Sequence, residues 1–585
     1  MAADYKYKIK EVKLKKGVPF TPGKINVFVG ANNCGKTQLL KDMLAYIVGS
    51  RENRILLDKM DIEYPDTPNE LLEAYNINVV ENTNGSYQIR HISPDLSNKV
   101  MGPAANDMDD SLKRWLEIED KIKFRTAIGP GMVTYLNTDN RLQLAKGQIV
   151  TDLQVEGAKN VLESLYLAGS SAVETVRKKV QESFGIDVYL DSSTLGKIQY
   201  RIGKDFAEVP DKGIEAYPIL STYPTLDSQG DGLRSFLGIA SALIALKKPI
   251  ILLDEPEAFL HPPQAMRLGE IVSELIDDSK QIFIATHSAD FLRGLLSTER
   301  DAQIIHLERL SNDETEAKTL NKATLSQIIT DPLLSSSRVL EGMFYKGVVA
   351  TEADADAVFY QRLYQKIGAS DEIHFLNVHN KQTLKKIIEP YQSLGIKFAM
   401  IADSDILRNS HELNDIIDKV ADTTLKIKIA EERRKILDYF EKKSQQEILE
   451  YLYLETEKLV KKERPNLDAP ESDWEAAVHD FRQVLKTLRE ESDDLAELKS
   501  KGREALPEEE QKIFDSFCRH CESVGLFVAW RGELESWLID YGVERGKKKN
   551  KWISKALETI YDLEIDDQKD VWKFIKSVRQ YFAGE

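Results

Sequence analysis

Cysteine is scarce and long apolar runs are missing from this chain of 585 residues. Its three cysteines, Cys34, Cys518 and Cys521, are too few for a disulfide framework, which indicates a reducing compartment. No apolar run approaches the roughly 20 residues that a membrane-spanning helix requires, and the first residues lack the apolar core of a signal peptide. We therefore expect a cytoplasmic protein with no membrane contact.

Positive charge is outnumbered in this sequence. The 79 lysines and arginines face 96 aspartates and glutamates, which gives a formal net charge of −17. This balance argues against a uniformly basic coat for nucleic acid. It does not exclude DNA binding, since a local groove or bound metal ions can supply a positive field. A hydrophobic content of 42% and a charged content of 30% are typical of globular domains and exclude general disorder.

Strand-like and helix-like segments alternate along the chain. The short apolar runs that predict buried strands are 24–29, 249–254, 281–286, 347–351, 374–378 and 398–402. Helical periods between them predict an α/β fold with mostly parallel sheets. Because the pattern restarts after the polar stretch 335–337, we expect a first domain at 1–335 and a second at 336–585. Residues 155–183 are predicted to be helical, and the charged segment 411–522 is predicted to be a helical insertion.

A phosphate loop follows the strand predicted at 24–29. The segment Gly30-Ala-Asn-Asn-Cys-Gly-Lys-Thr37 matches G-x-x-x-x-G-K-[ST] and precedes a predicted helix. Glycines let backbone N–H groups surround phosphate oxygens, and the helix N-terminus adds its positive dipole. Lysine reaches the β- and γ-phosphates, and the threonine hydroxyl is a ligand for Mg²⁺. The strand–loop–helix context disfavours a chance glycine-rich turn. The candidate nucleotide ligands here are Gly30, Asn32, Asn33, Gly35, Lys36 and Thr37.

Two further strands end in residues suited to phosphate chemistry. Asp254 and Glu255 directly follow four aliphatic residues, so we predict that Asp254 holds Mg²⁺ and that Glu255 polarises the attacking water. His287 ends the next strand, where it would lie near the γ-phosphate. The alternatives are an ordinary charged strand end and a structural histidine. Ser228 and Gly230 open a helix, and they predict either a phosphate contact or a simple helix cap.

The order of these four elements resembles that of the ABC ATPase superfamily, with its Walker A, signature, Walker B and switch-histidine motifs. The resemblance implies that Ser228 and Gly230 cover ATP bound to a second subunit, in a homodimer or higher oligomer, and that Arg141 contacts nucleotide or Mg²⁺. It also implies a dimerisation insertion at about 150–215. The signature here is SQGDG rather than the transporter form LSGGQ, and no transmembrane segment is apparent, so a transporter is disfavoured.

A second group of carboxylates follows the strands of the second half. Glu352 comes after 347–351, and Asp403 and Asp405 come after 398–402. Adjacent ends of parallel strands converge at one edge, where sites form. Clustered carboxylates repel one another unless they bind cations, and oxygen ligands suit Mg²⁺ or Mn²⁺. The alternative for the aspartate pair is a plain acidic turn.

This carboxylate pattern resembles a TOPRIM domain, although Ala353 replaces the usual glycine after the glutamate. An ABC head with a TOPRIM domain resembles the OLD (overcoming lysogenization defect) nucleases over most of the chain, apart from the helical insertion at 411–522 and the segment 60–130. Family members cleave phosphodiesters with two metal ions. By this resemblance the metal ligands are Glu352, Asp356, Asp403, Asp405, Glu533 and Glu535. The resemblance also implies a catalytic lysine, for which Lys551 and its rival Lys549 are the candidates. A solvated helix start is the alternative for the last acidic pair.

Two remaining signals carry less weight. Cys518 and Cys521 have the spacing of half a zinc site, but no second pair exists, so we interpret them as accidental. The lysine run 547–551 fits either a solvated face or a DNA contact.

The leading hypothesis is an ATP-regulated DNA endonuclease of the OLD type that depends on Mg²⁺ or Mn²⁺. The resemblance to that family implies a role in bacterial defence against phage. A partner protein or nucleic acid of such a system would then be involved. One rival is a topoisomerase- or primase-like TOPRIM enzyme, for which we find neither a strand-passage tyrosine context nor a zinc module. The other is a non-catalytic ABC-type dimer that senses or clamps DNA on a degenerate TOPRIM scaffold. Metal-dependent cleavage of plasmid DNA separates them.

Overall fold

The structure is a computed structural model of the whole chain. It describes residues 6–74, 78–81, 87–90, 99–101, 114, 121–150, 153, 158–194, 196–210, 213–246, 248–297, 302–311, 314–320, 322–331, 334, 337–369, 372–378, 381–460, 470, 474–475, 477–479, 481–482, 485, 496–545 and 549–584. These divide into two compact units, Met1–Lys346 with Ser393–Gly395, and Gly347–Gln392 with Ile396–Glu585. Ser335 and Ser336 of the expected boundary lie outside the described residues.

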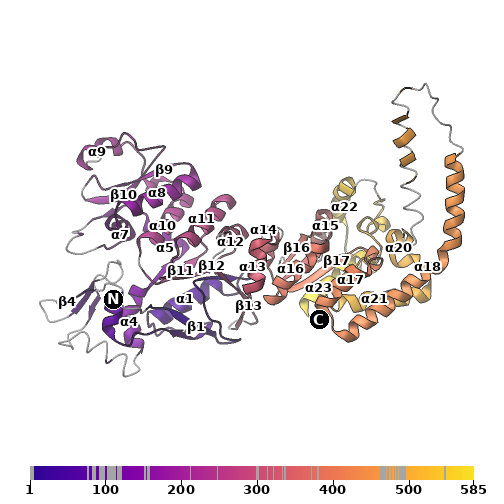
Figure 1. Cartoon of the computed structure of the whole chain (residues 1–585), viewed down its shortest axis with the longest axis horizontal. Coiled ribbons are helices and arrows are strands. Elements are labelled where there is room, and N and C mark those ends of the chain that lie inside the picture. The colour runs from indigo at the N-terminus through magenta and orange to yellow at the C-terminus, as the bar shows by residue number, and fades with distance from the viewer. Residues whose placement is uncertain are drawn as a thin grey trace. The chain divides into compact units, whose positions relative to one another are not determined.

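The first unit alternates strands and helices (Figure 1). Its strands are β1 (Ile9–Leu14), β2 (Ile25–Val29), β3 (Leu57–Ile62), β4 (Asn78–Glu81), β5 (Tyr87–Arg90), β6 (Lys99–Met101), β7 (Val133–Leu136), β8 (Gln148–Ile149), β9 (Asp187–Asp191), β10 (Lys197–Gly203), β11 (Ile250–Asp254), β12 (Gln281–Ala285), β13 (Ala302–Arg309) and β14 (Thr315–Thr319). Its helices are α1 (Lys36–Ile47), α2 (Pro68–Ala74), α4 (Lys121–Met132), α5 (Thr138–Leu144), α7 (Val161–Ala168), α8 (Ser170–Phe184), α9 (Gly213–Leu220), α10 (Asp231–Ala245), α11 (Pro262–Leu275), α12 (Ala289–Leu296), α13 (Lys322–Thr330) and α14 (Ser337–Glu341).

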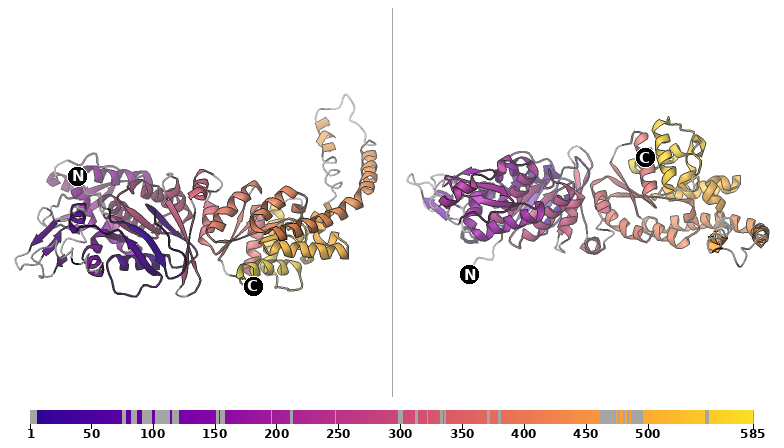
Figure 2. Two further views of the ribbon diagram at one scale, coloured as in Figure 1. Left: turned by 60° about the horizontal axis from the view of Figure 1, so that its bottom comes forward. Right: turned by 90° about the horizontal axis from the view of Figure 1, so that it is seen from above.

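The central sheet of this unit has the described strand order β14-β13-β2-β12-β11-β7. All neighbours run parallel except β14, which is antiparallel to β13. Every residue of β2, β11 and β12 is buried, because α1 covers one face and α10, α11 and α12 cover the other (Figures 1 and 2). Pairing of Asp254 with Ala285, and of Ala285 with Phe28, places the carboxyl ends of these strands side by side. The phosphate loop, Glu255 and His287 follow those ends.

The helical prediction for 155–183 spans two helices rather than one. Gly169 separates α7 from α8 with φ of 90° and ψ of 178°, a conformation that glycine adopts without steric cost. No other described atom lies within 4 Å of a Cβ placed there, so backbone conformation, not space, selects glycine.

The second unit holds a four-stranded parallel sheet in the described order β16-β15-β17-β18. Its elements are β15 (Gly347–Thr351), α15 (Asp354–Lys366), β16 (Ile373–Asn377), α16 (Lys381–Ser393), β17 (Lys397–Ala402), α17 (Ser410–Val420), α18 (Thr423–Val460), α20 (Ala496–Lys501), α21 (Glu508–Glu522), β18 (Leu526–Val528), α22 (Lys549–Asp562) and α23 (Asp570–Ala583). Helices α15, α22 and α23 pack through one apolar cluster that includes Phe359, Trp552 and Phe574.

The helical insertion lies between β17 and β18 and includes the 38-residue helix α18 (Figure 1). The expected α/β class, with an ATPase domain followed by a second parallel-sheet domain with a helical insertion, is confirmed. Among the described helices, none combines the length and apolar character needed to span a bilayer.

Candidate functional site

The phosphate loop curls around the end of Lys36. Its turn uses positive φ at Gly30, Asn33 and Gly35, with values of 139°, 61° and 101°. A Cβ on Gly30 would lie 2.4 Å from the carbonyl oxygen of Leu307, so no side chain fits there. Lys36 Nζ donates to the carbonyl oxygens of Gly30 at 2.7 Å and Ala31 at 3.0 Å. Burial lowers the pKa of Lys36, so its charge is poorly solvated in this loop.

Asp254 is held by three groups at the end of β11. Its Oδ1 accepts from Thr37 Oγ1 at 2.9 Å and its Oδ2 accepts from the Tyr135 hydroxyl at 3.0 Å. Its carbonyl oxygen accepts from Arg141 Nη1 at 2.6 Å. The predicted Mg²⁺ ligands Thr37 and Asp254 are therefore adjacent, and a hydroxyl beside a carboxylate is an oxygen donor set that fits Mg²⁺.

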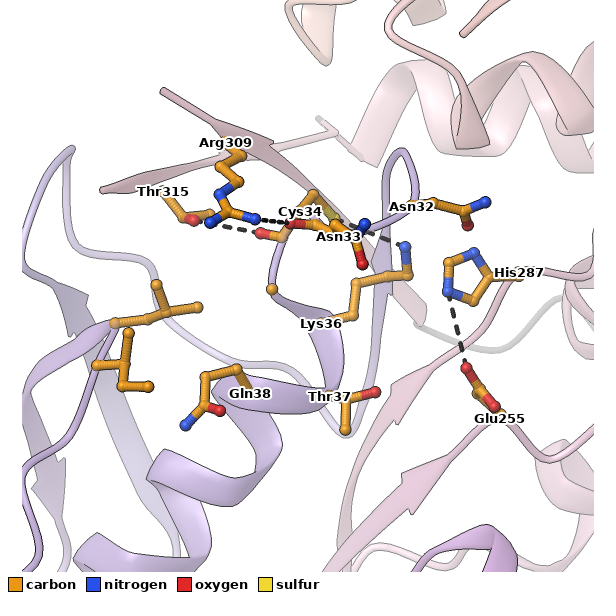
Figure 3. A pocket seen from close by; sticks show the side chains of 13 residues that line it. Asn32, Asn33, Cys34, Lys36, Thr37, Gln38, Glu255, His287, Arg309 and Thr315 are labelled. Atoms are coloured by element: carbon orange, nitrogen blue, oxygen red, sulfur yellow. Dashed lines mark hydrogen bonds and ion pairs between the residues drawn. The ribbon is translucent and has the colours of Figure 1, made fainter. Parts of the chain in front are cut away.

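Glu255 and His287 face the loop across a cavity of about 480 Å³ (Figure 3). His287 Nε2 lies 3.9 Å from Glu255 Oε1. Burial and the Lys36 charge lower the pKa of His287 to about 4, so the ring is neutral near pH 7. Glu255 has a positive φ of 47°, which turns it out of the strand direction. Asn32, Asn33, Gly35, Lys36 and Thr37 also line the cavity.

Four residues predicted to touch nucleotide, Gly30, Arg141, Ser228 and Gly230, are not among the residues that line this cavity. Arg141 is fully buried and lies behind Asp254, which it positions through the backbone. Ser228 is exposed and its hydroxyl donates to Thr225 at 2.7 Å. Gly230 caps α10, with no atom of another described residue within 4 Å of a Cβ placed there. The last two positions are exposed to solvent in the single chain.

The acidic group of the second unit gathers around Tyr360, which α15 contributes. Burial raises the pKa of Tyr360 far above its usual value, and the charges of Asp403, Asp356 and Glu352 raise it further. Because such an effect requires proximity, three of the predicted carboxylates lie close to one buried phenol. The Tyr360 hydroxyl accepts a hydrogen bond from Trp537 Nε1 at 2.8 Å.

Asp356 and Asp405 differ in their surroundings. Asp356 Oδ2 accepts from the backbone N–H of Ala353 at 3.0 Å, so this aspartate also fixes the turn that follows β15. Asp405 Oδ2 lies 3.6 Å from Lys499 Nζ, an ammonium contributed by the end of the helical insertion. The buried Asp405 Oδ1 accepts no hydrogen bond from the described residues, which leaves it suited to a cation.

A segment at the end of the insertion joins the two acidic loops. Ser404, between Asp403 and Asp405, donates its N–H to Gly532 O at 2.8 Å and its hydroxyl to Leu498 O at 3.0 Å. Arg503 N donates to Trp530 O at 2.8 Å. A Cβ on Gly532 would lie 2.2 Å from the Lys499 carbonyl oxygen. We call residues 498–503 the brace, because they contact both loops through the backbone.

The remaining predicted ligands lie on the loop and helix that follow β18. Glu533 forms an ion pair with Arg545. Glu535 is half-buried in the short 3-10 helix Leu534–Ser536, and Lys551 is exposed at the start of α22. Residues 547 and 548 of the lysine run, and the side chain of Lys549, lie outside the described part. Among the described residues, no three His, Cys, Asp or Glu side chains already stand as a metal-binding group.

Comparison with known proteins bears on both units. A family model described as "AAA domain, putative AbiEii toxin, Type IV TA system" matches residues 221–293, which contain the signature loop, Asp254 and His287. One described as "Overcoming lysogenization defect protein-like, TOPRIM domain" matches residues 343–405, which contain Glu352 and Asp403. The chain joins an AAA-type ATPase domain to an OLD-like TOPRIM domain.

The curated "Old nuclease" of Escherichia phage P2 is 29% identical over 171 residues, which is 27% of this chain and 28% of that relative. An Smc head bound to the C-terminal winged-helix domain of ScpA has 13% identity and a TM-score of 0.30, covering 54% of this chain and 98% of that one. The SMC head of Thermotoga maritima has 14% identity and a TM-score of 0.27, covering 54% and 99%. Neither of these two likenesses bears on function.

Several residues of the ATPase head and the TOPRIM domain escaped the sequence analysis. Tyr135 holds Asp254, and Glu257 Oε1 accepts the backbone N–H of His287 at 2.7 Å. Arg309 and Thr315 reach the phosphate loop from the β13–β14 hairpin, bonding the carbonyl oxygens of Asn33 and Cys34 at 3.2 Å each. Lys499 and the brace are contributed by α20 and the residues just after it, which are distant in sequence from Asp403 and Asp405. Only Glu257 had a sequence signal, as the third acid of the Asp-Glu-Pro-Glu run.

Proposed function

We propose that the chain is an ATP-regulated, divalent-metal-dependent DNA endonuclease. The single observation that carries this proposal is the gathering of Glu352, Asp356 and Asp403 around Tyr360 at the carboxyl edge of a parallel sheet, within an OLD-like TOPRIM domain. The charges of these three carboxylates act on one buried phenol, and a cation held among them would offset that negative field. The similarity to the Old nuclease over 171 residues supports the same reading.

The oxygen donors fit a hard divalent cation such as Mg²⁺ or Mn²⁺. Glu352, Asp403 and Asp405 would hold it, and the buried Asp405 Oδ1 is an acceptor that receives no hydrogen bond from the described residues. When bound, such ions supply Lewis-acid stabilisation of the phosphate and a hydroxide nucleophile. Asp356 keeps the Ala353 turn in place, and Lys499 neutralises Asp405 until phosphate arrives. Glu533 and Glu535 would complete a second position if Arg545 releases Glu533.

In the ATPase head, Lys36 would exchange its loop carbonyl partners for the β- and γ-phosphates. Glu255 would accept a proton from the attacking water, and the neutral His287 beside it would contact the γ-phosphate without repelling Lys36. Ser228 and Gly230 would cover this phosphate from a second copy of the chain.

A role in defence against phage, with partner proteins or nucleic acid, is part of the same proposal and rests on the similarity to the OLD family.

A non-catalytic DNA sensor or clamp is the second candidate, and a specific observation favours it. Two of the predicted ligands are neutralised by basic side chains, Asp405 by Lys499 and Glu533 by Arg545. Ion pairs of this kind would neutralise the acidic side chains in a TOPRIM domain that no longer binds metal. The two functions differ in whether any phosphodiester bond is broken.

Incubation of purified chain with supercoiled plasmid separates the two functions. The proposal predicts nicked or linear DNA with Mg²⁺ or Mn²⁺, no cleavage with a chelator, and a rate that changes when ATP is added. Uncut plasmid under every metal and nucleotide condition, with ATP hydrolysis intact, would favour the sensor or clamp.

A further inference from the structure

The first unit holds a basic cavity that the proposed function leaves unexplained. It has a volume of about 290 Å³ and is lined by four lysines, Lys6, Lys8, Lys24 and Lys280, with one carboxylate, Asp278. The chain as a whole has a net charge of −17. Four ammonium groups around one small cavity therefore form a local positive field that opposes the average charge of the molecule.

One buried side chain fixes the backbone that carries these lysines. Gln281, at the start of β12, accepts from Ile9 N at 2.8 Å and donates to Ile9 O at 3.1 Å and Gly23 O at 3.3 Å. It is 4% exposed. These bonds tie the beginnings of β1, β2 and β12 together, so Lys8, Lys24 and Lys280, each next to a bonded residue, are brought to one place by the fold.

The charge of this cavity is incompletely neutralised. Lys24 Nζ lies 2.6 Å from Asp278 Oδ1, but Asp278 is 89% exposed and is the one carboxylate among the described residues that line the cavity. Lys6 and Lys8 are exposed, and their ammonium groups form no ion pair within the described part of the chain. An anion that enters the cavity thus meets at least two positive charges that no described carboxylate pairs with, beside the one carboxylate of Asp278.

The cavity is separate from the nucleotide site of the same unit. Lys24 precedes β2 and Gly30 follows it, while Lys280 precedes β12 and His287 lies beyond its end. A five-residue strand is roughly 17 Å long, so the lysines lie at the opposite edge of the sheet from the phosphate loop. These lysines are therefore too far from the phosphate loop to bind the phosphates of ATP.

The residue type indicates the ligand. Lysine is a compact point charge that binds phosphate, whereas arginine is the basic residue enriched at protein–protein interfaces and lysine is depleted there. We propose that this cavity binds a phosphate group of the DNA backbone and docks DNA on the ATPase head. The choice of DNA as the source of the phosphate rests on the proposed nuclease function. The preference for phosphate rests only on the lysines that line the cavity.

DNA binding without cleavage tests this inference. Fluorescence anisotropy of a labelled duplex is measured with full-length chain, in a chelator, across a range of salt concentrations. Lys6→Gln with Lys8→Gln should weaken binding about tenfold for each lysine at about 50 mM salt, and reduce the slope of log K against log salt by about two. ATP hydrolysis, measured with Mg²⁺, and thermal stability should be unchanged, because both lysines are exposed and distant from the nucleotide.

The same strand supplies a matched control. Lys10 and Lys13 lie on β1 but pair with Glu63 at 3.6 Å and Asp58 at 3.1 Å. Lys10→Gln with Lys13→Gln makes the same change in net charge and should alter DNA affinity by no more than a factor of about three. Equal losses in both double variants would mean that overall charge, not this cavity, binds DNA.

Other outcomes overturn the inference in distinguishable ways. If the Lys6 and Lys8 variant binds duplex as tightly as wild type but no longer binds inorganic phosphate, the cavity takes a free anion and not DNA. Wild type that does not bind duplex at all also overturns it. The chelator prevents cleavage during the binding measurement, so binding is tested independently of the nuclease. If wild type never cuts DNA in any assay, but the Lys6 and Lys8 variant still binds duplex more weakly than wild type, only the nuclease proposal is contradicted.

Discussion

Lys36 is a buried cation whose hydrogen bonds all go to its own loop. Its partners are two carbonyl oxygens and the sulfur of Cys34, 3.6 Å away. None of these groups neutralises a full charge, and burial lowers the pKa of the lysine. A phosphate would supply the missing negative charge, so binding energy is available at this position.

Lys36→Ala should therefore abolish ATP binding, measured with a fluorescent nucleotide analogue. Glu255→Gln should bind nucleotide normally and hydrolyse it at least a hundredfold more slowly, because the amide cannot accept a proton from water. Lys41→Ala is the control, since Lys41 is exposed on the same helix α1. Normal turnover in the Lys36 variant would show that the loop is not the nucleotide site.

At this scale, sequence spacing predicts residues whose neighbours are fixed locally. Lys36 and Thr37 follow from the loop pattern, and Asp254 follows from an apolar strand that ends in acids. Tyr135 and Lys499 could not be predicted in this way. Their contacts with Asp254 and Asp405 depend on which strand lies beside which and on where an insertion returns, and neither is encoded in local spacing.

Strand β13 places a histidine in the core of the ATPase unit. His306 is 4% exposed, and burial with the charges of Lys318 and Lys36 lowers its pKa to about 4. In the unfolded chain its pKa is about 6.5. Between these values the unfolded state binds a proton that the folded state does not, so stability is present above pH 6.5 and is lost as pH falls towards 4.

We expect the unfolding free energy of the ATPase unit to drop by up to about 3 kcal/mol across this window. His306→Gln should reduce the pH dependence, whatever its effect on stability at neutral pH. Urea denaturation at several pH values between 7.5 and 4.5 measures both. An unchanged pH dependence in the variant would mean that His306 titrates normally in the folded unit.

The brace makes one glycine critical to the acidic site. Gly532→Ala places a Cβ 2.2 Å from the Lys499 carbonyl oxygen at a φ of 96°. We expect a loss of roughly 2–4 kcal/mol in the stability of the TOPRIM unit and strongly reduced DNA cleavage, with ATP hydrolysis retained. Gly542→Ala is matched, since its φ is 76° but no atom of another described residue lies within 4 Å of the new Cβ. Equal effects of the two substitutions, in calorimetry and plasmid cleavage, would count against the brace.

The strands of the two sheets could be predicted from the sequence more completely than the contacts of the site residues. Every apolar run listed from the sequence forms a wholly or largely buried strand, because parallel strands covered on both faces need no polar alternation. The brace could not be predicted, since residues 498–503 lie in a charged helical segment whose period says nothing of where it ends. Glu533 was predicted as a ligand, but its ion pair with Arg545 depends on the same loop geometry.

For the whole molecule, the proposed ATPase cycle requires a second copy. Ser228 and Gly230 lie outside the cavity that holds the phosphate loop, so Glu255→Gln with ATP should shift the mass measured by light scattering to a dimer or higher. Ser228→Arg in that background should prevent the ATP-dependent shift without reducing nucleotide binding. A chain that remains monomeric at micromolar concentration, with and without ATP, would rule out this arrangement.

We propose that two separate sites in this chain carry out two hydrolytic reactions. Asp403→Ala should reduce plasmid cleavage roughly a thousandfold, because loss of charge stabilisation by metal removes several kcal/mol from the transition state. ATP hydrolysis in the same sample should be retained, since Thr37 and Asp254 lie in the other unit. Asp418→Asn is the control, an exposed carboxylate on α17 that pairs with Lys426. If the Asp403 variant cuts plasmid as wild type does, the acidic group around Tyr360 is not the nuclease site.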